Sequence, residues 1–570
     1  MPGKTPVTMA NKRSVLKTAG DGGRVDEGQS ERRTEDGRVT LAASAIVLAS
    51  VLGFCVVWPI AQSIWHSFAR AGSLEWSGVW SALAMSPMSV VRSLWAALLI
   101  GTLATALGWP AAWLLARGRG ARWAPLVLTP MLVPSYLAYS GWGMLRDPGT
   151  FLGDMLSRAA SDGARWAPLL AGKTFAVMGL ALWASPLAAL VLASGIARRD
   201  PAAEDALRLE PASFTRRVRT TLAMHRGAIA GSAALVSLVM LGSAVPLHLS
   251  QLDTLAVVVW RELAGSSRDL WWRSWVAATP LLVVALVAGW VIGGVLIRKG
   301  ARDAPEGPRE APTPRSRIGS KLGTLGVWAL GVGAPVALFA WGMRDPHSLM
   351  RFWRLSGDGA ISSLEVAGIV GAICLVLALA LSAALAVGGR GGRLVASIGV
   401  RVMLIAALIP GVLVGAAIAE ATTSVGLDLG LTAPVMACVA RGSFIVGIVA
   451  CWAAWSEPPS LRDTRRQLGG GWRAWALGAL PLQAPALLGG ALASAALSLH
   501  EIEATVMVWP PGLDSLSRQT LEYLHFSRME ELSAAAIWIT AVGLTLALLA
   551  GALIALASTR LRGAREGARA

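Results

Sequence analysis

Long apolar runs recur along the whole chain and constrain its fold more than any other feature. Twelve of them are long enough to cross a bilayer as a helix. They occupy approximately residues 41–63, 93–116, 123–145, 174–197, 227–248, 276–297, 322–343, 362–389, 402–419, 432–455, 484–507 and 534–558. The chain is 54% hydrophobic and only 15% charged, whereas a soluble protein of this size needs more charged surface. The runs therefore predict an all-α, polytopic membrane protein with about 12 transmembrane helices.

A polar segment rich in proline, glycine and charge divides the runs into two sets of six. It spans residues 298–321 and is expected to be a flexible cytoplasmic linker. We therefore expect two transmembrane domains, residues 40–297 and 322–559, flanked by tails at 1–39 and 560–570. The first tail contains no apolar run, so we expect it to be disordered.

The distribution of basic residues predicts the orientation of the chain. If the N-terminus is inside, 36 of the 51 Lys and Arg residues fall in inside segments, 14 fall in outside loops, and Arg441 lies within a run. This excess follows the positive-inside rule and places both termini in the cytoplasm, so the two halves form parallel repeats. It also accounts for the net charge of +17 without a nucleic-acid partner.

Ionisable residues are almost absent from the middles of the runs. Arg441 is the main one, and it either lines a solute pathway or reaches the outer interface. His500, Glu501 and Glu503 lie near the end of a run, where they contact solute, contact a docking protein or are solvated at the interface. A proton relay of acids or histidines is not evident, so an external energy source is favoured. The four cysteines show no CxxC spacing, and neither a metal site nor a disulfide framework is expected.

The cytoplasmic loop between the fourth and fifth runs carries a short charged helix. Asp200 is a good N-cap, Pro201 suits the first helical position, and Pro211 stops the helix. A helix of about ten residues is too short to be stable alone in water. Another protein that packs on it would supply the missing stability.

The matching loop of the second half repeats this design with different residues. Ser460 and Asp463 form an S-x-x-D capping pattern, and Gly469-Gly470-Gly471 supplies a left-handed stop. For either loop taken singly, a solvated loop helix and a docking element explain the pattern equally well. Two such helices at matching places favour docking elements for a partner protein.

Both loops resemble the "EAA" coupling loops of binding-protein-dependent ABC importer permeases. Glu204-Asp205-Ala206 match the Glu-Ala-Ala triplet with Asp for the middle Ala, although Glu210 replaces the family glycine. In the second half Asp463 stands for Glu and Gly469 for the glycine, and Leu480-Pro481 falls one residue early. The resemblance implies that the residues that contact the ATPase are Glu204, Asp205, Ala206, Leu207, Arg208, Asp463, Thr464, Arg465, Arg466, Leu468 and Gly469.

Two further stretches are similar to the fused double permeases of ferric iron importers. Residues 499–505, LHEIEAT, and 509–516, WPPGLDSL, match a segment of that subfamily, with Glu503 where the family carries proline. In the first half, residues 242–246, GSAVP, and 253–256, DTLA, look like the corresponding turn. Thiamine permeases are near relatives.

The resemblance implies a permease in the cytoplasmic (inner) membrane and not an enzyme. It implies two ABC ATPase subunits that bind the ATP, an extracytoplasmic solute-binding protein, and no cofactor in this chain. The solute expected first is ferric iron, with thiamine or another small solute as the alternative. The nearest P-loop match, at residues 167–174, lacks its first glycine.

Two rival classes stay open. A twelve-helix secondary carrier shares the helix count and the parallel repeat, but it gives no reason for capped helices in both matching loops. A membrane-embedded enzyme needs a cluster of acids or histidines at the membrane face, and His500 with Glu501 and Glu503 is a sparse candidate.

Overall fold

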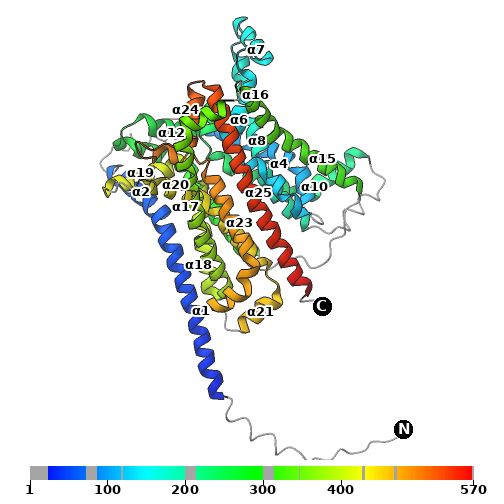
Figure 1. Ribbon diagram of the computed structural model, residues 1–570, viewed down its shortest axis with the longest axis vertical. Helices are drawn as coiled ribbons and strands as arrows, with labels where there is room; N and C mark the ends of the chain where they lie inside the picture. The colour runs from blue at the N-terminus through cyan, green and yellow to red at the C-terminus, as the bar shows by residue number, and fades with distance from the viewer. Residues whose placement is uncertain are drawn as a thin grey trace, which may run out of the picture.

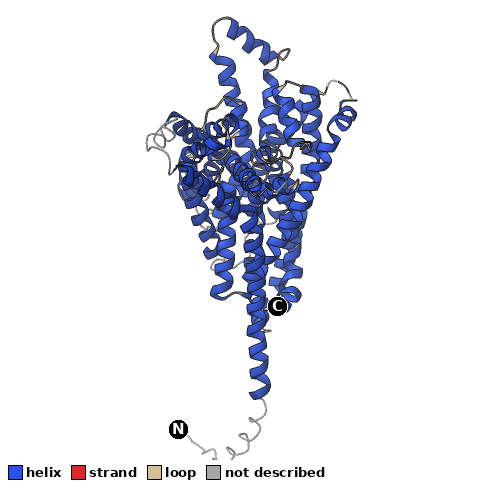
Figure 2. Ribbon diagram, turned by 90° about the vertical axis from the view of Figure 1, so that its left-hand side faces the viewer, coloured by secondary structure: helices blue, strands red, loops and turns tan. Residues whose placement is uncertain are grey.

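The computed structural model of the chain describes residues 23–71, 87–116, 120–198, 213–299, 314–343, 345, 347–426, 430–467 and 471–567. Every regular element in these ranges is a helix, as Figure 2 shows. The all-α fold predicted from the apolar runs is therefore confirmed.

The helices of the first half follow the predicted order, with short elements between them. Their bounds are α1 Gly23–Leu52, α2 Trp58–Ala71, α4 Pro87–Ala116, α5 Ala124–Leu128, η3 Thr129–Leu132, α6 Ser135–Gly143, α7 Phe151–Ser161, α8 Trp166–Ala197, α10 Phe214–Leu241, α11 Val245–Leu249, α12 Leu255–Gly265, α13 Trp271–Ala277 and α14 Thr279–Lys299. A five-residue π-helical segment, Gly53–Val57, joins α1 to α2.

The second half repeats much of this arrangement. Its helices are α15 Pro314–Trp328, α16 Ala334–Gly342, α17 Ser348–Val387, α18 Gly389–Leu408, α19 Gly411–Ser424, α20 Thr432–Ser456, α21 Pro459–Gln467, α22 Trp472–Ala474, α23 Leu480–Ser498, η8 Thr505–Met507, α24 Leu516–His525 and α25 Met529–Gly567. A π-helical segment, Ala329–Gly333, joins α15 to α16, as Gly53–Val57 joins α1 to α2.

Two segments that were expected to be irregular are helical. Residues 23–39 belong to α1, although the sequence predicts a disordered tail there, and residues 314–321 of the expected linker belong to α15. In both cases a polar segment continues the helix of an adjacent apolar run. Extending an existing helix costs far less free energy than nucleating one, so the polar residues follow the run.

Eleven helices in the described part of the chain are long and apolar enough to cross a membrane. They match ten of the twelve predicted runs. The run at 123–145 is interrupted between η3 and α6, and the run at 402–419 crosses a break between α18 and α19. Val133 and Pro134 adopt extended backbone at the first break, and Pro134 precedes the first turn of α6. The second half has the same break at Ile409 and Pro410, between α18 and α19. Proline lacks an amide hydrogen and disfavours helix in the residue before it, which explains both interruptions.

Each half builds its core from three packed helices. In the first half α4, α8 and α10 pack against one another, and in the second half α17, α20 and α23 do the same. Small residues permit the close approach: a Cβ on Gly101 of α4 would lie 2.3 Å from the hydroxyl of Ser237 on α10. Gly371 of α17 meets Ala495 of α23 in the same way. The two sets are therefore equivalent units.

The two halves are interlocked and do not merely lie side by side. Helix α1 packs on α17 and α18 of the second half, while α15 packs on α4 and α16 on α6 of the first half. The last helices also cross over, because α14 packs on α18 and α25 on α5 and η3. In Figure 1 the start of α1 and the end of α25 both lie toward the lower end of the molecule, opposite α7.

The outer surface of the helices is apolar. Val287, Trp290 and Val291 of α14 are each between 56% and 59% exposed. A soluble protein rarely leaves such a face open to water, whereas lipid tails solvate it well. The chain is therefore a multi-pass membrane protein.

Candidate functional site

Helix α21 lies in the second predicted coupling loop and follows directly on α20. Its first helical bond runs from the amide of Arg462 to the carbonyl of Pro458, at 3.0 Å. Ser460 therefore lies inside the first turn and is not the N-cap that the sequence pattern predicts; its carbonyl accepts the hydroxyl of Thr464 at 2.9 Å. Pro459 stands at the first helical position, where its fixed φ favours the helix, and this explains the earlier start.

A buried ion pair anchors α21 to the transmembrane bundle. The guanidinium of Arg465 donates to both carboxylate oxygens of Glu457, at 3.1 and 3.0 Å, and each residue is only 3% exposed. Arg465 also donates to the carbonyl of Ala386, in the last turn of α17. Arg462 adds weaker bonds to the carbonyls of Ala454 and Glu457, at 3.4 and 3.3 Å. The anchor fixes α21 relative to α17 and α20.

The opposite face of α21 is open and polar. Ser460, Asp463, Thr464 and Gln467 are exposed, and their spacing places them on one side of the helix. Asp463 and Thr464 thus lie where a partner could contact them, whereas Arg465 faces inward. The side chain of Arg466 lies outside the described part of the chain, as do Leu468 and Gly469. The whole first coupling helix, including Glu204, Asp205, Ala206, Leu207 and Arg208, lies outside it too.

A second cluster of charged residues forms where the two halves meet. We call it the central junction; it consists of Arg441 on α20, Glu501 and Glu503 in the loop after α23, and residues Ser243–Val245 of the first half. Arg441 donates to the carbonyls of Ala407 and Ile409, at 2.5 and 2.8 Å, where α18 ends at its proline break. Its guanidinium lies 3.5 Å from Glu501 and 3.7 Å from Glu503.

Glu503 joins the second half to the first. Its Oε1 accepts the amide of Ala244 at 2.8 Å, and the amide of Val245 and the hydroxyl of Ser243 at 3.4 Å. These residues belong to the GSAVP turn that the sequence pairs with the loop of Glu503 itself. The two matching turns are therefore in contact across the interface between the halves.

The sequence leaves open whether these acids are solvated at the interface, and the structure shows that they are not. Glu503 and His500 are each only 9% exposed, and the side chain of Arg441 is 17% exposed. Arg441 does not reach outward to solvent, because its guanidinium caps the end of α18. Burial lowers the pKa of His500 to about 4, so this imidazole is neutral at pH 7.

Two similar hydrogen bonds hold the DTLA and DSL turns, one in each half. The amide of Leu255, in the DTLA turn, donates to the hydroxyl of Ser93 on α4 at 2.7 Å. The amide of Leu516, in the matching DSL turn, donates to Ser363 on α17 at 2.9 Å. Sequence analysis did not single out the two serines, because neither belongs to a motif. The serines lie 162 and 153 residues before the amides that they accept, so their spacing from the repeated turns is not equal and gave no signal.

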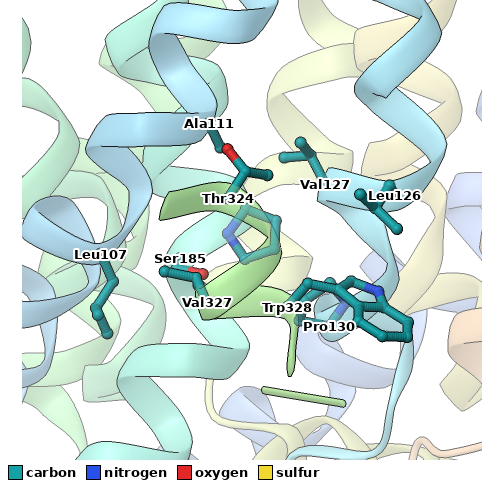
Figure 3. A pocket seen from close by; sticks show the side chains of 10 residues that line it. Leu107, Ala111, Leu126, Val127, Pro130, Ser185, Thr324, Val327 and Trp328 are labelled. Atoms are coloured by element: carbon teal, nitrogen blue, oxygen red, sulfur yellow. The ribbon is translucent and has the colours of Figure 1, made fainter. Parts of the chain in front are cut away.

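Other features offer little chemistry. A small cavity, shown in Figure 3, lies between α4, α8 and α15 and is lined mainly by apolar side chains. Its two hydroxyls, on Ser185 and Thr324, already donate to backbone carbonyls at 2.8 and 2.7 Å. Among the described residues, no group of three or more His, Cys, Asp or Glu side chains is placed to hold a metal ion. The two charged clusters are therefore the candidate functional sites.

Comparison with known proteins gives no further assignment. The chain matches no family model, no curated protein and no solved structure.

Proposed function

We propose that this chain is the membrane-spanning permease subunit of an ABC importer. The observation that carries the proposal is α21, a short polar helix that is held rigidly to the bundle while one face stays open. The bundle holds this nine-residue helix in a fixed position, and a protein that docks there would contact the exposed residues Ser460, Asp463 and Thr464. The two interlocked repeats support the proposal, because two ATPase subunits require two equivalent membrane partners.

The anchor explains how such a partner would move the bundle. ATP-driven closure of the ATPase subunits displaces α21, and the Glu457–Arg465 pair passes this displacement to α20. The bond from Arg465 to Ala386 passes it to α17, which packs on α20 and α23. Because packed helices move as rigid units, the two halves rock against each other at the central junction. No covalent chemistry takes place in this chain, and the ATP is bound by the partner.

The solute comes to the outer face from an extracytoplasmic binding protein. The similarity of residues 499–505 and 509–516 to ferric iron permeases makes ferric iron the first candidate. Thiamine or another small solute is the alternative. In this proposal the membrane is the cytoplasmic one, with both termini inside.

A twelve-helix secondary carrier is the second candidate, and the central junction favours it. Buried acids such as Glu501 and Glu503 are the groups that proton-coupled carriers use. Uptake of radiolabelled iron or thiamine by cells separates the two functions. The permease proposal predicts loss of uptake on ATP depletion and no loss with an uncoupler, and the opposite pattern supports a carrier.

A double substitution tests the coupling helices directly. We expect Glu204→Gln with Asp463→Asn to abolish ATP-driven uptake while the protein still accumulates in the membrane. Asp162→Asn is the matched control, because Asp162 is an exposed aspartate directly after α7 and outside both predicted coupling loops. Unchanged uptake in the double variant would contradict the assignment of both helices.

A further inference from the structure

Glu503 is bonded to residues of both halves at the central junction. One carboxylate oxygen accepts the amides of Ala244 and Val245 and the hydroxyl of Ser243, all in the first half. The other oxygen lies 3.7 Å from Arg441 of the second half. Separation of the halves at this point would break all three bonds to the first half.

Helix α19 packs tightly against the loop that carries Glu503. A Cβ on Gly411 would lie 2.6 Å from the Cβ of Glu503, and a Cβ on Gly415 would lie 2.1 Å from the carbonyl oxygen of Ala504. Real Cβ atoms do not approach so closely, so only glycine fits at these positions. The loop is therefore held in place by backbone packing, which leaves Glu503 little freedom to relax.

The charges at the junction do not balance. Two carboxylates, Glu501 and Glu503, face one guanidinium, and Arg441 directs its best hydrogen bonds to the carbonyls of α18. Its distances to the carboxylates, 3.5 and 3.7 Å, are ion-pair contacts beyond hydrogen-bond range. Arg441 Nε and Glu503 Oε2 are buried without a hydrogen-bond partner. His500 is neutral when its pKa is about 4, so it adds no positive charge.

A buried charge without full compensation is costly, and water removes that cost. We infer that the central junction is the closed gate of the solute path and that Glu503 is its latch. The bonds to Ala244, Val245 and Ser243 hold the gate shut, while the uncompensated charge favours opening. The inference rests on the proposed transport function, because a gate requires a path between the halves.

Two substitutions of Glu503 distinguish the effect of its hydrogen bonds to the first half from the effect of its charge. Glu503→Asp keeps the charge, but its side chain is one methylene shorter and does not reach the amide of Ala244. It should shift the equilibrium toward the open gate. Glu503→Gln keeps the reach and an acceptor oxygen for Ala244 but removes the charge, so it should shift the equilibrium toward the closed gate. A residue with only a structural role would respond to both changes in the same direction.

The assay measures how often the junction opens to water. Val245 is 1% exposed, so a cysteine at this position reacts with a water-soluble maleimide only when the gate opens. The reaction rate therefore reports even a small open population. The four native cysteines, which are all buried, are replaced by alanine, and the full-length chain is studied alone in lipid nanodiscs.

We expect labelling of Val245→Cys to become about tenfold faster with Glu503→Asp and about tenfold slower with Glu503→Gln, the effect of one charge-assisted interaction. Glu530→Gln is the matched control, because Glu530 pairs with Arg351 on the exposed surface and should change nothing. A cysteine in place of the exposed Phe526 measures the reaction rate of the maleimide with an accessible thiol, and the rates at position 245 are divided by it.

An unchanged or faster rate with Glu503→Gln overturns the inference, and this variant keeps the size of the native side chain. The assay uses no ATPase. A failure here therefore leaves the ABC assignment standing, and a failure of ATPase docking leaves this result intact.

Discussion

Loss of the Glu457–Arg465 pair should detach α21 from the bundle. Glu457 is 3% exposed in the native protein, and Arg465→Met removes both of its short ion-pair contacts. Among the described side chains that pair with Glu457, Arg462 then remains, with its Nε 4.0 Å from Oε2 of Glu457. Removal of one partner from a buried pair costs about 3–5 kcal/mol, because the other charge is left uncompensated. A helix of nine residues has little stability of its own to offset this cost.

Hydrogen exchange measures the detachment. At about 1.4 kcal/mol per tenfold, this loss of stability corresponds to amide exchange in residues 459–467 that is faster by roughly 10²-fold to a few thousandfold, measured by mass spectrometry in nanodiscs. Arg462→Met is the matched control, since Arg462 lies on the same helix as Arg465 but makes longer hydrogen bonds to the end of α20. It should speed exchange by less than about tenfold.

The double variant Glu457→Gln with Arg465→Met should recover part of the protection, because no buried charge remains. We also expect Arg465→Met to lose ATP-driven uptake. Exchange in α21 that stays within about threefold of wild type in a folded Arg465→Met protein would refute the anchor and the path of displacement derived from it.

Three further outcomes follow from the junction and the repeats. Burial raises the pKa of Glu503 above its ordinary 4.5 in the closed gate, despite the nearby arginine and backbone amides that lower it. The carboxyl of Glu503 therefore binds its proton more tightly in the closed gate than in the hydrated, open gate, so protonation stabilises the closed gate. This stabilisation is complete below about pH 4.5 and is lost as the pH rises through the raised pKa. Labelling of Val245→Cys, corrected for reagent chemistry, should slow as pH falls from about 7 to about 5, and a rise would contradict the charge argument. Ser363→Ala leaves the buried amide of Leu516 without an acceptor and should lower stability by about 1–3 kcal/mol in detergent unfolding, where no change would show that the bond is dispensable. Gly415→Ala should destabilise by about 1–3 kcal/mol or prevent folding, whereas Gly368→Ala, which meets nothing within 4 Å, should be tolerated.

The sequence predicts the membrane helices well because their signal is local. Ten of the twelve predicted runs correspond to long apolar helices. The two exceptions, 123–145 and 402–419, fail at Pro134 and Pro410, since a hydropathy average does not register a single break in backbone geometry. The sequence also did not predict the N-terminal parts of α1 and α15, because composition does not show how far a stable helix propagates into polar residues.

The functional clusters depend on long-range pairing, which one sequence does not reveal. Arg441 lies 60 residues from Glu501, and the amide of Ala244 lies 259 residues from its acceptor Glu503. Periodicity identifies each residue as unusual but does not identify its partner. Glu457 was missed for a different reason. It precedes two prolines at the end of a run, where a lone acid is ordinarily solvated, and only folding buries it against Arg465.

Site-specific crosslinking tests the central claim, that α21 receives an ATPase. A photoreactive benzoylphenylalanine at Thr464, on the exposed face of α21, is compared in living cells with one at Phe151, the first residue of α7, a helix that lies at the opposite end of the molecule from α21 in Figure 1. The account predicts that the Thr464 probe captures a protein that mass spectrometry identifies as an ABC ATPase with a complete P-loop, and that the Phe151 probe does not. Capture of an extracytoplasmic protein at Thr464, or no ATPase adduct in cells that transport actively, would contradict the account.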